Sequence, residues 1–140
     1  MHQIAQGLRE IHANGIVHRD LKHLNIFLSD ASAEHPKIKI GDFGLACKLG
    51  EDECIKKMAG TIGFMAPEVV LDEPSDFKSD IWSLGVILYA LIGSGVPFSG
   101  RDREATAHNI VSQPLNFSRS VWQSVSNECK DLLEKMLDKD

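Results

Sequence analysis

The stretch His18–Asn25 reads H-R-D-L-K-H-L-N and is followed directly by a short apolar segment, Ile26–Leu28. The carboxylate of Asp20 is able to accept a proton from a hydroxyl group. Lys22, two residues on, points to the same side of an extended chain and is able to neutralise an anion beside that hydroxyl. Asn25 offers an oxygen ligand to a hard cation. A carboxylate, a cation and a metal ligand so close together suit phosphoryl transfer, which depends mainly on positioning and charge neutralisation.

The composition is that of a globular protein. The chain has 140 residues, 43% of them hydrophobic and 25% charged, which suits one domain. The net charge of −5 argues against a nucleic-acid-binding surface. The longest apolar run, Val86–Ile92, is too short to cross a membrane, and the start of the chain does not resemble a signal peptide. The cysteines Cys47, Cys54 and Cys129 have no paired or zinc-binding spacing, so we expect a reduced, cytoplasmic compartment.

Residues 1–15 predict an amphipathic helix, because apolar side chains recur at a spacing of three to four residues. Asn14-Gly15 ends this helix, since glycine suits a left-handed cap. Ile16-Val17 then predicts a very short strand that leads into the stretch at 18–25. The apolar positions of the helix are Ile4, Leu8 and Ile11.

Two short strands are predicted to form a hairpin after this stretch. Ile26–Leu28 predicts a buried strand, and residues 29–36 are polar and turn-forming. Residues 37–41, K-I-K-I-G, alternate in polarity and predict the partner strand. The hairpin returns the chain to 18–25 and brings Asp42 beside it, with Gly44 allowing an unusual backbone turn.

The second half of the chain predicts an α-rich body. Residues 45–65 show no persistent period and predict a long exposed segment. Lys78–Ile92 is apolar nearly all round, which predicts a helix buried in the middle of the fold and opened by Ser79 or Asp80. Arg103–Ser112 predicts a modest helix.

A last amphipathic helix is predicted from Ser126, which suits its N-cap, through Leu137. The expected fold class is therefore mainly α with a small β-hairpin. The inward-facing residues of the last helix are Leu132, Leu133, Met136 and Leu137.

Four motifs follow one another along the chain. They are H-R-D-x-K-x-x-N at 18–25, D-F-G at 42–44, A-P-E at 66–68 and D-x-W-S-L-G at 80–85. In this order they resemble the eukaryotic protein kinases of the serine/threonine type. The resemblance covers the whole chain and implies the large, helical lobe of that fold. A weaker resemblance, at 86–100 and 122–133, is to the calcium/calmodulin-dependent and calcium-dependent kinase groups.

The resemblance implies a role for several residues around the first motif. Asp20 would be the catalytic base that orients the substrate hydroxyl, and Lys22 would contact the transferred phosphate of ATP. Asn25 and Asp42 would be the two ligands of Mg²⁺, which prefers oxygen donors. Phe27 would lie either under the adenine ring of ATP or in the core as a plain aromatic residue.

The resemblance also bears on the substrate. Thr61, in G-T-I-G-F-M-A-P-E, matches the threonine that bonds both the base and the lysine in serine/threonine kinases. Serine and threonine hydroxyls of protein substrates would therefore be the acceptors. Met58, Ile62 and Met65 flank the position where the family binds the residue after the acceptor, so we expect an apolar preference there.

Other matched residues would support the site. His18 and Phe43 would stack in the hydrophobic column that links the two lobes in the family, and Asp80 would hydrogen-bond the backbone of the catalytic loop. The family pairs the glutamate of A-P-E with an arginine from a later segment, so Glu68 is expected to lack that arginine partner in this chain.

Two departures from the family pattern concern regulation and specificity. Residues 45–60 contain no Ser, Thr or Tyr, so Arg19 lacks the phosphorylated partner that this loop usually supplies. Either the acids Glu51–Glu53 provide a standing negative partner for Arg19, or they form a solvated face. Leu24 stands where kinases that prefer basic substrates often have an acid.

We expect residues 1–140 to be part of a kinase domain, because the glycine-rich loop and strand lysine of the family's small lobe are not in this sequence. The parent protein would supply that small lobe, and the C-terminal end would be truncated. Two interpretations remain open. One is a serine/threonine kinase catalytic region that uses ATP and Mg²⁺. The other is a non-catalytic kinase-like binding module, or the product of a truncated gene.

Residues 1–140 alone are expected to give negligible phosphate transfer, because half of the nucleotide clamp is missing. The measurement is transfer of labelled γ-phosphate from ATP to a mixed protein substrate, with the longer parent protein as positive control. Robust transfer by the purified 140-residue chain would contradict this expectation.

Overall fold

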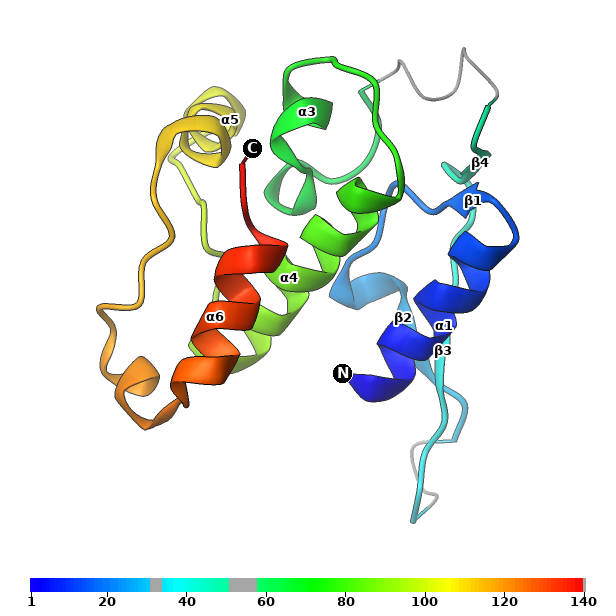
Figure 1. Cartoon of the computed structure of the whole chain (residues 1–140), viewed down its shortest axis with the longest axis horizontal. Coiled ribbons are helices and arrows are strands. Elements are labelled where there is room, and N and C mark those ends of the chain that lie inside the picture. The colour runs from blue at the N-terminus through cyan, green and yellow to red at the C-terminus, as the bar shows by residue number, and fades with distance from the viewer. Residues whose placement is uncertain (31–33, 51–57, 140) are drawn as a thin grey trace.

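The computed structural model of the chain describes residues 1–30, 34–50 and 58–139 (Figure 1). The helices are α1 (His2–Ala13), α3 (Pro67–Val70), α4 (Phe77–Gly93), α5 (Arg103–Ser112) and α6 (Asn127–Met136). The 3-10 turns are η1 (His23–Asn25), η2 (Ile62–Phe64) and η3 (Ser120–Ser124). The strands are β1 (Ile16–Val17), β2 (Ile26–Leu28), β3 (Ile38–Ile40) and β4 (Cys47–Lys48). The fold class is thus mainly α with a small β-hairpin, as predicted, and none of the helices in the described ranges is long and apolar enough to cross a bilayer.

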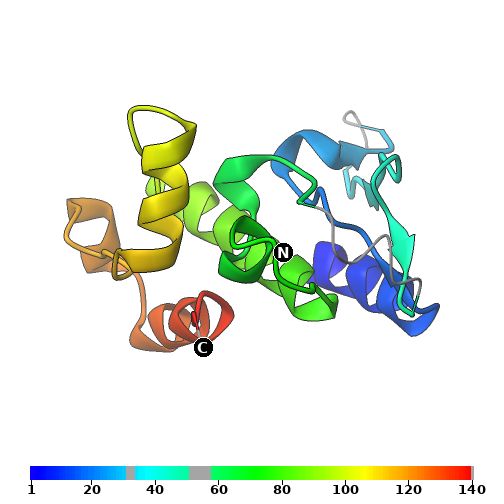
Figure 2. The same ribbon diagram turned by 90° about the horizontal axis from the view of Figure 1, so that it is seen from above.

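Helix α4 lies in the middle of the molecule, with α5 and α6 on one side and α1 with the β2–β3 hairpin on the other (Figure 1, Figure 2). Its buried apolar residues are Trp82, Leu84, Val86, Ile87 and Tyr89. The other helices complete this core with Leu8, Ile110, Trp122 and Leu133. The central buried helix predicted from the sequence is therefore confirmed.

The start and the outer face of α4 differ from the prediction. Its N-cap is Asp76, whose carboxylate accepts a hydrogen bond from the backbone N–H of Lys78 at 2.6 Å. Neither Ser79 nor Asp80 opens the helix, because a cap must lie outside the first turn to reach its unpaired N–H groups. Leu91 is 65% exposed, so α4 is not buried all round.

Helix α1 presents one apolar face to the core, as its spacing predicts. Ile4 and Leu8 are buried, and the chain turns at Gly15 in the left-handed conformation (φ 73°). Strand β1 then pairs antiparallel with β4. Strand β4 lies within the segment 45–65, for which the sequence predicts a loop, and two residues are too few to leave a periodic signal.

Strands β2 and β3 form the predicted antiparallel hairpin. One further hydrogen bond, from the N–H of Gly41 to the C=O of Asn25 at 3.0 Å, carries the pairing back to the stretch at 18–25. The predicted burial of β2 is wrong, because Phe27 is 51% and Leu28 is 52% exposed. The hairpin packs on α1 through β3, and this contact leaves the side chains of Phe27 and Leu28 open.

Helices α5 and α6 both begin at capped positions. Asp102 accepts a hydrogen bond from the N–H of Ala105 at 2.7 Å, and Ser126, the predicted cap, accepts one from the N–H of Cys129 at 3.3 Å. On α6, Leu133 is fully buried, whereas Leu132 is 49% exposed. The inward direction predicted for Leu132 is wrong, because neighbouring helix positions point about 100° apart, and on α6 the core lies on the side of Leu133.

The Leu133→Ala variant is expected to lose about 2–5 kcal/mol in the free energy of unfolding, because truncation of a buried leucine leaves a cavity. Leu132→Ala, at the adjacent exposed position, is the matched control and should lose less than about 1 kcal/mol. Urea unfolding followed by circular dichroism measures both. Equal losses would contradict the assignment of the two faces of α6.

Candidate active site

The stretch at 18–25 is held by a buried carboxylate on α4. Asp80 is fully buried and accepts hydrogen bonds from the backbone N–H groups of His18 at 2.8 Å and Arg19 at 2.9 Å. The Nε2 atom of His12 lies 2.8 Å from the same carboxylate. Arg19 has φ 68°, a left-handed conformation that is unfavourable for a residue with a side chain. Asp80 therefore fixes a strained turn directly before Asp20.

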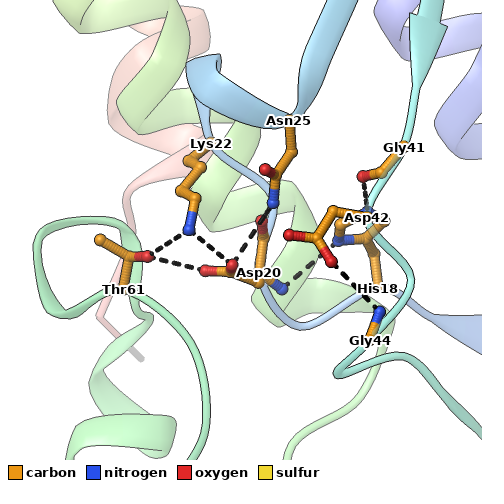
Figure 3. Close-up of polar contacts among 8 residues, drawn as sticks. All are labelled: His18, Asp20, Lys22, Asn25, Gly41, Asp42, Gly44 and Thr61. Atoms are coloured by element: carbon orange, nitrogen blue, oxygen red, sulfur yellow. Dashed lines mark hydrogen bonds and ion pairs between the residues drawn. The ribbon is translucent and has the colours of Figure 1, made fainter.

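Four of the predicted site residues form one hydrogen-bonded network (Figure 3). Lys22 Nζ lies 2.6 Å from Asp20 Oδ2 and donates to Thr61 Oγ1 at 2.9 Å. The hydroxyl of Thr61 in turn donates to Asp20 Oδ1 at 2.8 Å. Asn25 Nδ2 donates to the backbone oxygen of Asp20 at 2.8 Å and contacts Oδ2 at 3.3 Å. Both carboxylate oxygens of Asp20 are thus fixed in direction.

Asp20 stays ionised in this network. Burial raises the pKa of its carboxyl group, but hydrogen bonds from Lys22 and Thr61, the charge of Lys22 and a hydrogen bond from Asn25 together lower the pKa below its usual value. At neutral pH such a carboxylate accepts a hydrogen bond from a hydroxyl group but is a weak base. The group is therefore better suited to orient a hydroxyl than to remove its proton early.

A single 3-10 turn positions the two partners from the same stretch. Lys22 is extended (φ −154°, ψ 165°), and η1 begins immediately after it. The N–H of Asn25 donates to the C=O of Lys22 at 3.0 Å, which closes the turn. Asn25 is brought back beside Asp20 and is only 5% exposed. The spacing of H-R-D-x-K-x-x-N is thus the spacing that one tight turn needs.

Gly60 lets the segment before η2 approach the stretch at 18–25. Its φ of 114° lies in the region that favours glycine. A Cβ atom at this position would lie 2.5 Å from the backbone oxygen of Arg19. This close approach brings Thr61 against Asp20. Sequence reasoning did not single out Gly60, although a glycine directly before the matched threonine was an available signal.

The segment 41–44 is tied to the stretch at 18–25 through His18. The Nε2 atom of His18 lies 3.1 Å from the backbone oxygen of Gly41, and its ring lies 5.0 Å from that of Phe43. The unusual backbone conformation predicted for Gly44 belongs to Asp42 instead, with φ 62°. The N–H of Gly44 donates to Asp42 Oδ1 at 3.4 Å, and this local hydrogen bond helps an aspartate to adopt the left-handed conformation.

Comparison with known proteins agrees with this geometry. The family model of the protein kinase domain matches residues 1–140. The chain belongs to the protein kinase family. It is 41% identical over 126 residues to the serine/threonine-protein kinase PEPKR2 of Arabidopsis thaliana, an alignment that covers 90% of this chain and 26% of that protein.

Two further relatives of the kinase chain are much longer proteins. This chain is 39% identical over 140 residues to the smooth muscle myosin light chain kinase of Gallus gallus. The alignment covers 100% of this chain and 7% of that protein. The chain is 40% identical over 140 residues to the titin homolog of Caenorhabditis elegans, again over 100% of this chain and 1% of the relative. The chain therefore spans about a quarter or less of the length of these relatives.

The donors at Asn25 and Asp42 fit the magnesium ion that kinases use. Because Nδ2 of Asn25 donates to Asp20, its amide oxygen is the atom available to a cation. Figure 3 shows the carboxylate of Asp42 turned to the side on which Asn25 and Asp20 lie. Within the described ranges, no three His, Cys, Asp or Glu side chains gather as a metal site. Two oxygen donors nevertheless suit Mg²⁺, which takes its remaining ligands from phosphates and water.

Phe27 is not a plain core aromatic residue. Its side chain is 51% exposed. It lies beside Gly41, where a Cβ atom would come within 2.9 Å of Phe27 Cε2. The interpretation as a core aromatic residue is therefore wrong, and contact with an adenine ring stays a prediction.

The three residues expected beside the substrate do not line one surface. Met65 is 5% exposed and belongs to the core, whereas Met58 is 43% exposed. The backbone N–H of Met58 donates to Asp72 at 3.2 Å, and its Sδ atom lies 3.2 Å from Nη2 of Arg103 on α5. Ile62 is half-buried. Met58 and Ile62 thus remain candidates for a substrate contact, and Met65 does not.

Two expectations about charged groups have different outcomes. Glu68 accepts a hydrogen bond from the hydroxyl of Ser79 on α4 at 2.6 Å, so a neutral partner takes the place expected for the arginine. The hydroxyl satisfies the half-buried carboxylate. The hypothesis that Glu51–Glu53 supply a partner for Arg19 concerns residues outside the described ranges.

The Thr61→Val variant is expected to raise the pKa of Asp20, because it removes one of the hydrogen bonds that lower it. A lowered pKa in the folded state stabilises the protein above the unfolded pKa, and this stabilisation is lost as pH falls through the folded pKa. Acid unfolding of the variant should therefore begin at a higher pH. Carbon-13 NMR of the carboxyl group measures the pKa directly.

Thr61→Ser keeps the hydroxyl and is the matched control for this titration. We expect its Asp20 pKa to stay close to that of the unmodified protein. An unchanged pKa in Thr61→Val would show that the hydroxyl does not stabilise the carboxylate.

Proposed function

We propose that this chain is the catalytic region of a serine/threonine protein kinase, which transfers the γ-phosphate of ATP to serine and threonine hydroxyls of protein substrates. The observation that carries the proposal is the network in which Lys22 and Thr61 fix both the charge and the direction of the Asp20 carboxylate. A buried carboxylate held between a part-buried cation and a part-buried hydroxyl supports a reaction at a hydroxyl oxygen next to a phosphate.

In this mechanism, Asp20 accepts a hydrogen bond from the substrate hydroxyl and aims its oxygen at the γ-phosphorus. As the new O–P bond forms, the bond from the γ-phosphorus to the bridging oxygen of ADP breaks. The hydroxyl proton passes to Asp20. Because the pKa of Asp20 is lowered, the transfer of this proton comes late, after most of the O–P bond has formed.

Lys22 would place its positive charge between two negative groups, the carboxylate of Asp20 and the phosphate of ATP. Its ammonium group already contacts Asp20 and Thr61, so it is held within reach of a hydroxyl bound at Asp20. In this position it would stabilise the negative oxygens of the transferred phosphoryl group. Thr61 would fix the ammonium group without adding charge, which supports its assignment as a catalytic positioning residue.

Asn25 and Asp42 would hold Mg²⁺, and Phe27 would contact the adenine ring of ATP. When bound, the ion would supply positive charge to the phosphate oxygens. The backbone of Asp42 is strained, and its neighbours Gly41 and Phe43 both contact His18, two residues before Asp20. These contacts support a nucleotide site made from two separate segments.

Residues 1–140 would be part of a kinase domain in a longer protein, whose small lobe would complete the ATP site. Its substrates would be proteins in the cytoplasm, a compartment that the cysteine spacing favours. Met58 and Ile62 support an apolar preference at the substrate position after the acceptor, since both retain exposed surface near Thr61. Profiling with peptides varied at that position tests this preference.

In the longer parent protein, Asp20→Asn is expected to lower kcat by about 10²–10⁴, because an amide orients the hydroxyl poorly and takes no proton. Asp42→Ala should abolish magnesium-dependent ATP binding, measured by calorimetry with and without Mg²⁺. Asp131→Asn, an exposed position on α6, is the control for both measurements.

Unchanged kcat in Asp20→Asn would refute the catalytic assignment. The alternative, a non-catalytic binding module, makes the opposite prediction. In that case the unmodified parent protein would bind protein partners but transfer no phosphate, and Asp20→Asn would leave partner binding unchanged.

A further inference from the structure

The ammonium group of Lys139 lies in a cradle of backbone carbonyl oxygens at the C-terminal end of α5. Figure 1 shows the chain running from the end of α6 to the side of α5. There, the Nζ atom of Lys139 donates hydrogen bonds to the backbone oxygens of Ile110 and Gln113, both at 2.6 Å, and of Asn109 at 3.3 Å. One side chain thus joins the segment after α6 to the end of α5.

The charge of Lys139 suits the end of a helix. The last carbonyl groups of an α-helix have no partner within the helix and carry a partial negative charge. The last turn of α5, residues 109–112, contains no basic residue. Lys139 therefore supplies from another segment the positive charge that a lysine or arginine in that turn would supply.

An aromatic ring completes the cradle and connects it to the central helix. The Nζ atom of Lys139 lies 4.4 Å from the centre of the Phe98 ring, a distance at which a ring face attracts a cation. Phe98 is buried and stacks on Trp82 of α4, with 5.6 Å between the ring centres. Burial lowers the pKa of Lys139, because the ammonium group loses water, and the carbonyl oxygens and the ring offset that loss.

The opposite end of α5 lies against the segment that carries the candidate substrate contacts. Helix α5 packs on η2, which directly follows Thr61. Arg103, the first residue of α5, places its Nη2 atom 3.2 Å from Sδ of Met58. Met58 and Ile62 are the remaining candidates for a substrate contact. A displacement of α5 would therefore move the surface on which a peptide is expected to lie.

The reactive groups are held by other contacts. Asp80 of α4 fixes the backbone directly before Asp20, and the close approach of Gly60 to Arg19 brings Thr61 to the carboxylate. A displacement of α5 is therefore expected to weaken the binding of a peptide more than it slows the chemical step.

We propose that Lys139 is a positioning residue for the protein substrate. Its ammonium group fixes α5, and α5 supports the surface formed by Met58 and Ile62. The inference rests on the proposed kinase function. Lys139 acts through α5 and takes no part in the transfer of the phosphoryl group.

The test is steady-state phosphate transfer by the longer parent protein to a serine peptide. Lys139→Met removes the ammonium group and keeps an unbranched side chain. We expect the KM for the peptide to rise about fivefold, the scale of a residue that acts through packed neighbours, while kcat and the KM for ATP stay unchanged. Hydrogen exchange of the α5 amides, followed by mass spectrometry, should become faster, because the helix loses its cradle.

Two control variants isolate the effect of the cradle. Lys135→Met makes the same change of charge at an exposed lysine in the last turn of α6, and should change neither the KM nor the exchange of α5. Lys139→Arg keeps the positive charge and several donors, so it should keep the KM near that of the unmodified protein. If thermal unfolding shows that Lys139→Met does not fold, Lys139→Gln takes its place, because its amide still donates hydrogen bonds, and its KM for the peptide should also rise.

The outcomes separate this inference from the function on which it rests. If the unmodified protein transfers phosphate but the neutral variant at position 139 has an unchanged KM for the peptide, the positioning role is refuted and the kinase function stands. A fall in kcat with an unchanged KM also refutes it, since that pattern indicates a loss of folded protein. If the unmodified protein transfers no phosphate, both proposals fail. A rise in KM that Lys139→Arg does not show supports the assignment.

Discussion

The hydrogen bonds from the backbone of His18 and Arg19 to Asp80 are the interaction on which the site depends. A fully buried carboxylate without partners would be strongly destabilising. Three features offset that cost. Asp80 accepts hydrogen bonds from two backbone N–H groups, and it contacts the ring of His12. It also lies in the N-terminal turn of α4, where the helix dipole favours negative charge. The two N–H groups gain an acceptor that neither helix nor sheet provides at this turn. The central helix and the reactive stretch are therefore one structural unit.

Two other segments reach the site through contacts of the same kind. Gly60 approaches the backbone oxygen of Arg19 so closely that no side chain fits between them, and this approach brings Thr61 to Asp20. His18 contacts the backbone oxygen of Gly41 and so fixes the segment that carries the next carboxylate. Because each contact involves backbone atoms, the fold positions the backbone of the reactive segments, and the side-chain hydrogen bonds among Asp20, Lys22 and Thr61 then set the direction of the reactive groups.

The sequence predicted the members of the Asp20 network because short spacings carried the information. Lys22 and Asn25 lie within one turn of Asp20, and motif order located Thr61. Prediction from the sequence failed where packing against residues distant in the chain decides the local backbone conformation. Glycine is the residue expected in a left-handed turn, so Gly44 was the natural choice. The structure instead imposes that conformation on Asp42, whose environment is fixed by a stretch more than twenty residues earlier.

Burial is the property that the sequence predicted least well: Phe27, Leu28 and Leu132 were expected to face the core, yet each is about half exposed. His18, Asp20 and Asn25 are polar but at most 9% exposed, whereas Leu24 and Phe27 are apolar but more than half exposed. The apolar character of a side chain indicates that burial against another surface would stabilise it. It does not indicate whether that surface belongs to the same chain or to a partner. The folded chain has already desolvated its polar groups and satisfied them with hydrogen bonds, and it leaves apolar surface open next to them. Such an inversion opposes stability in the isolated domain, and it is physically reasonable where substrate and nucleotide are the expected partners.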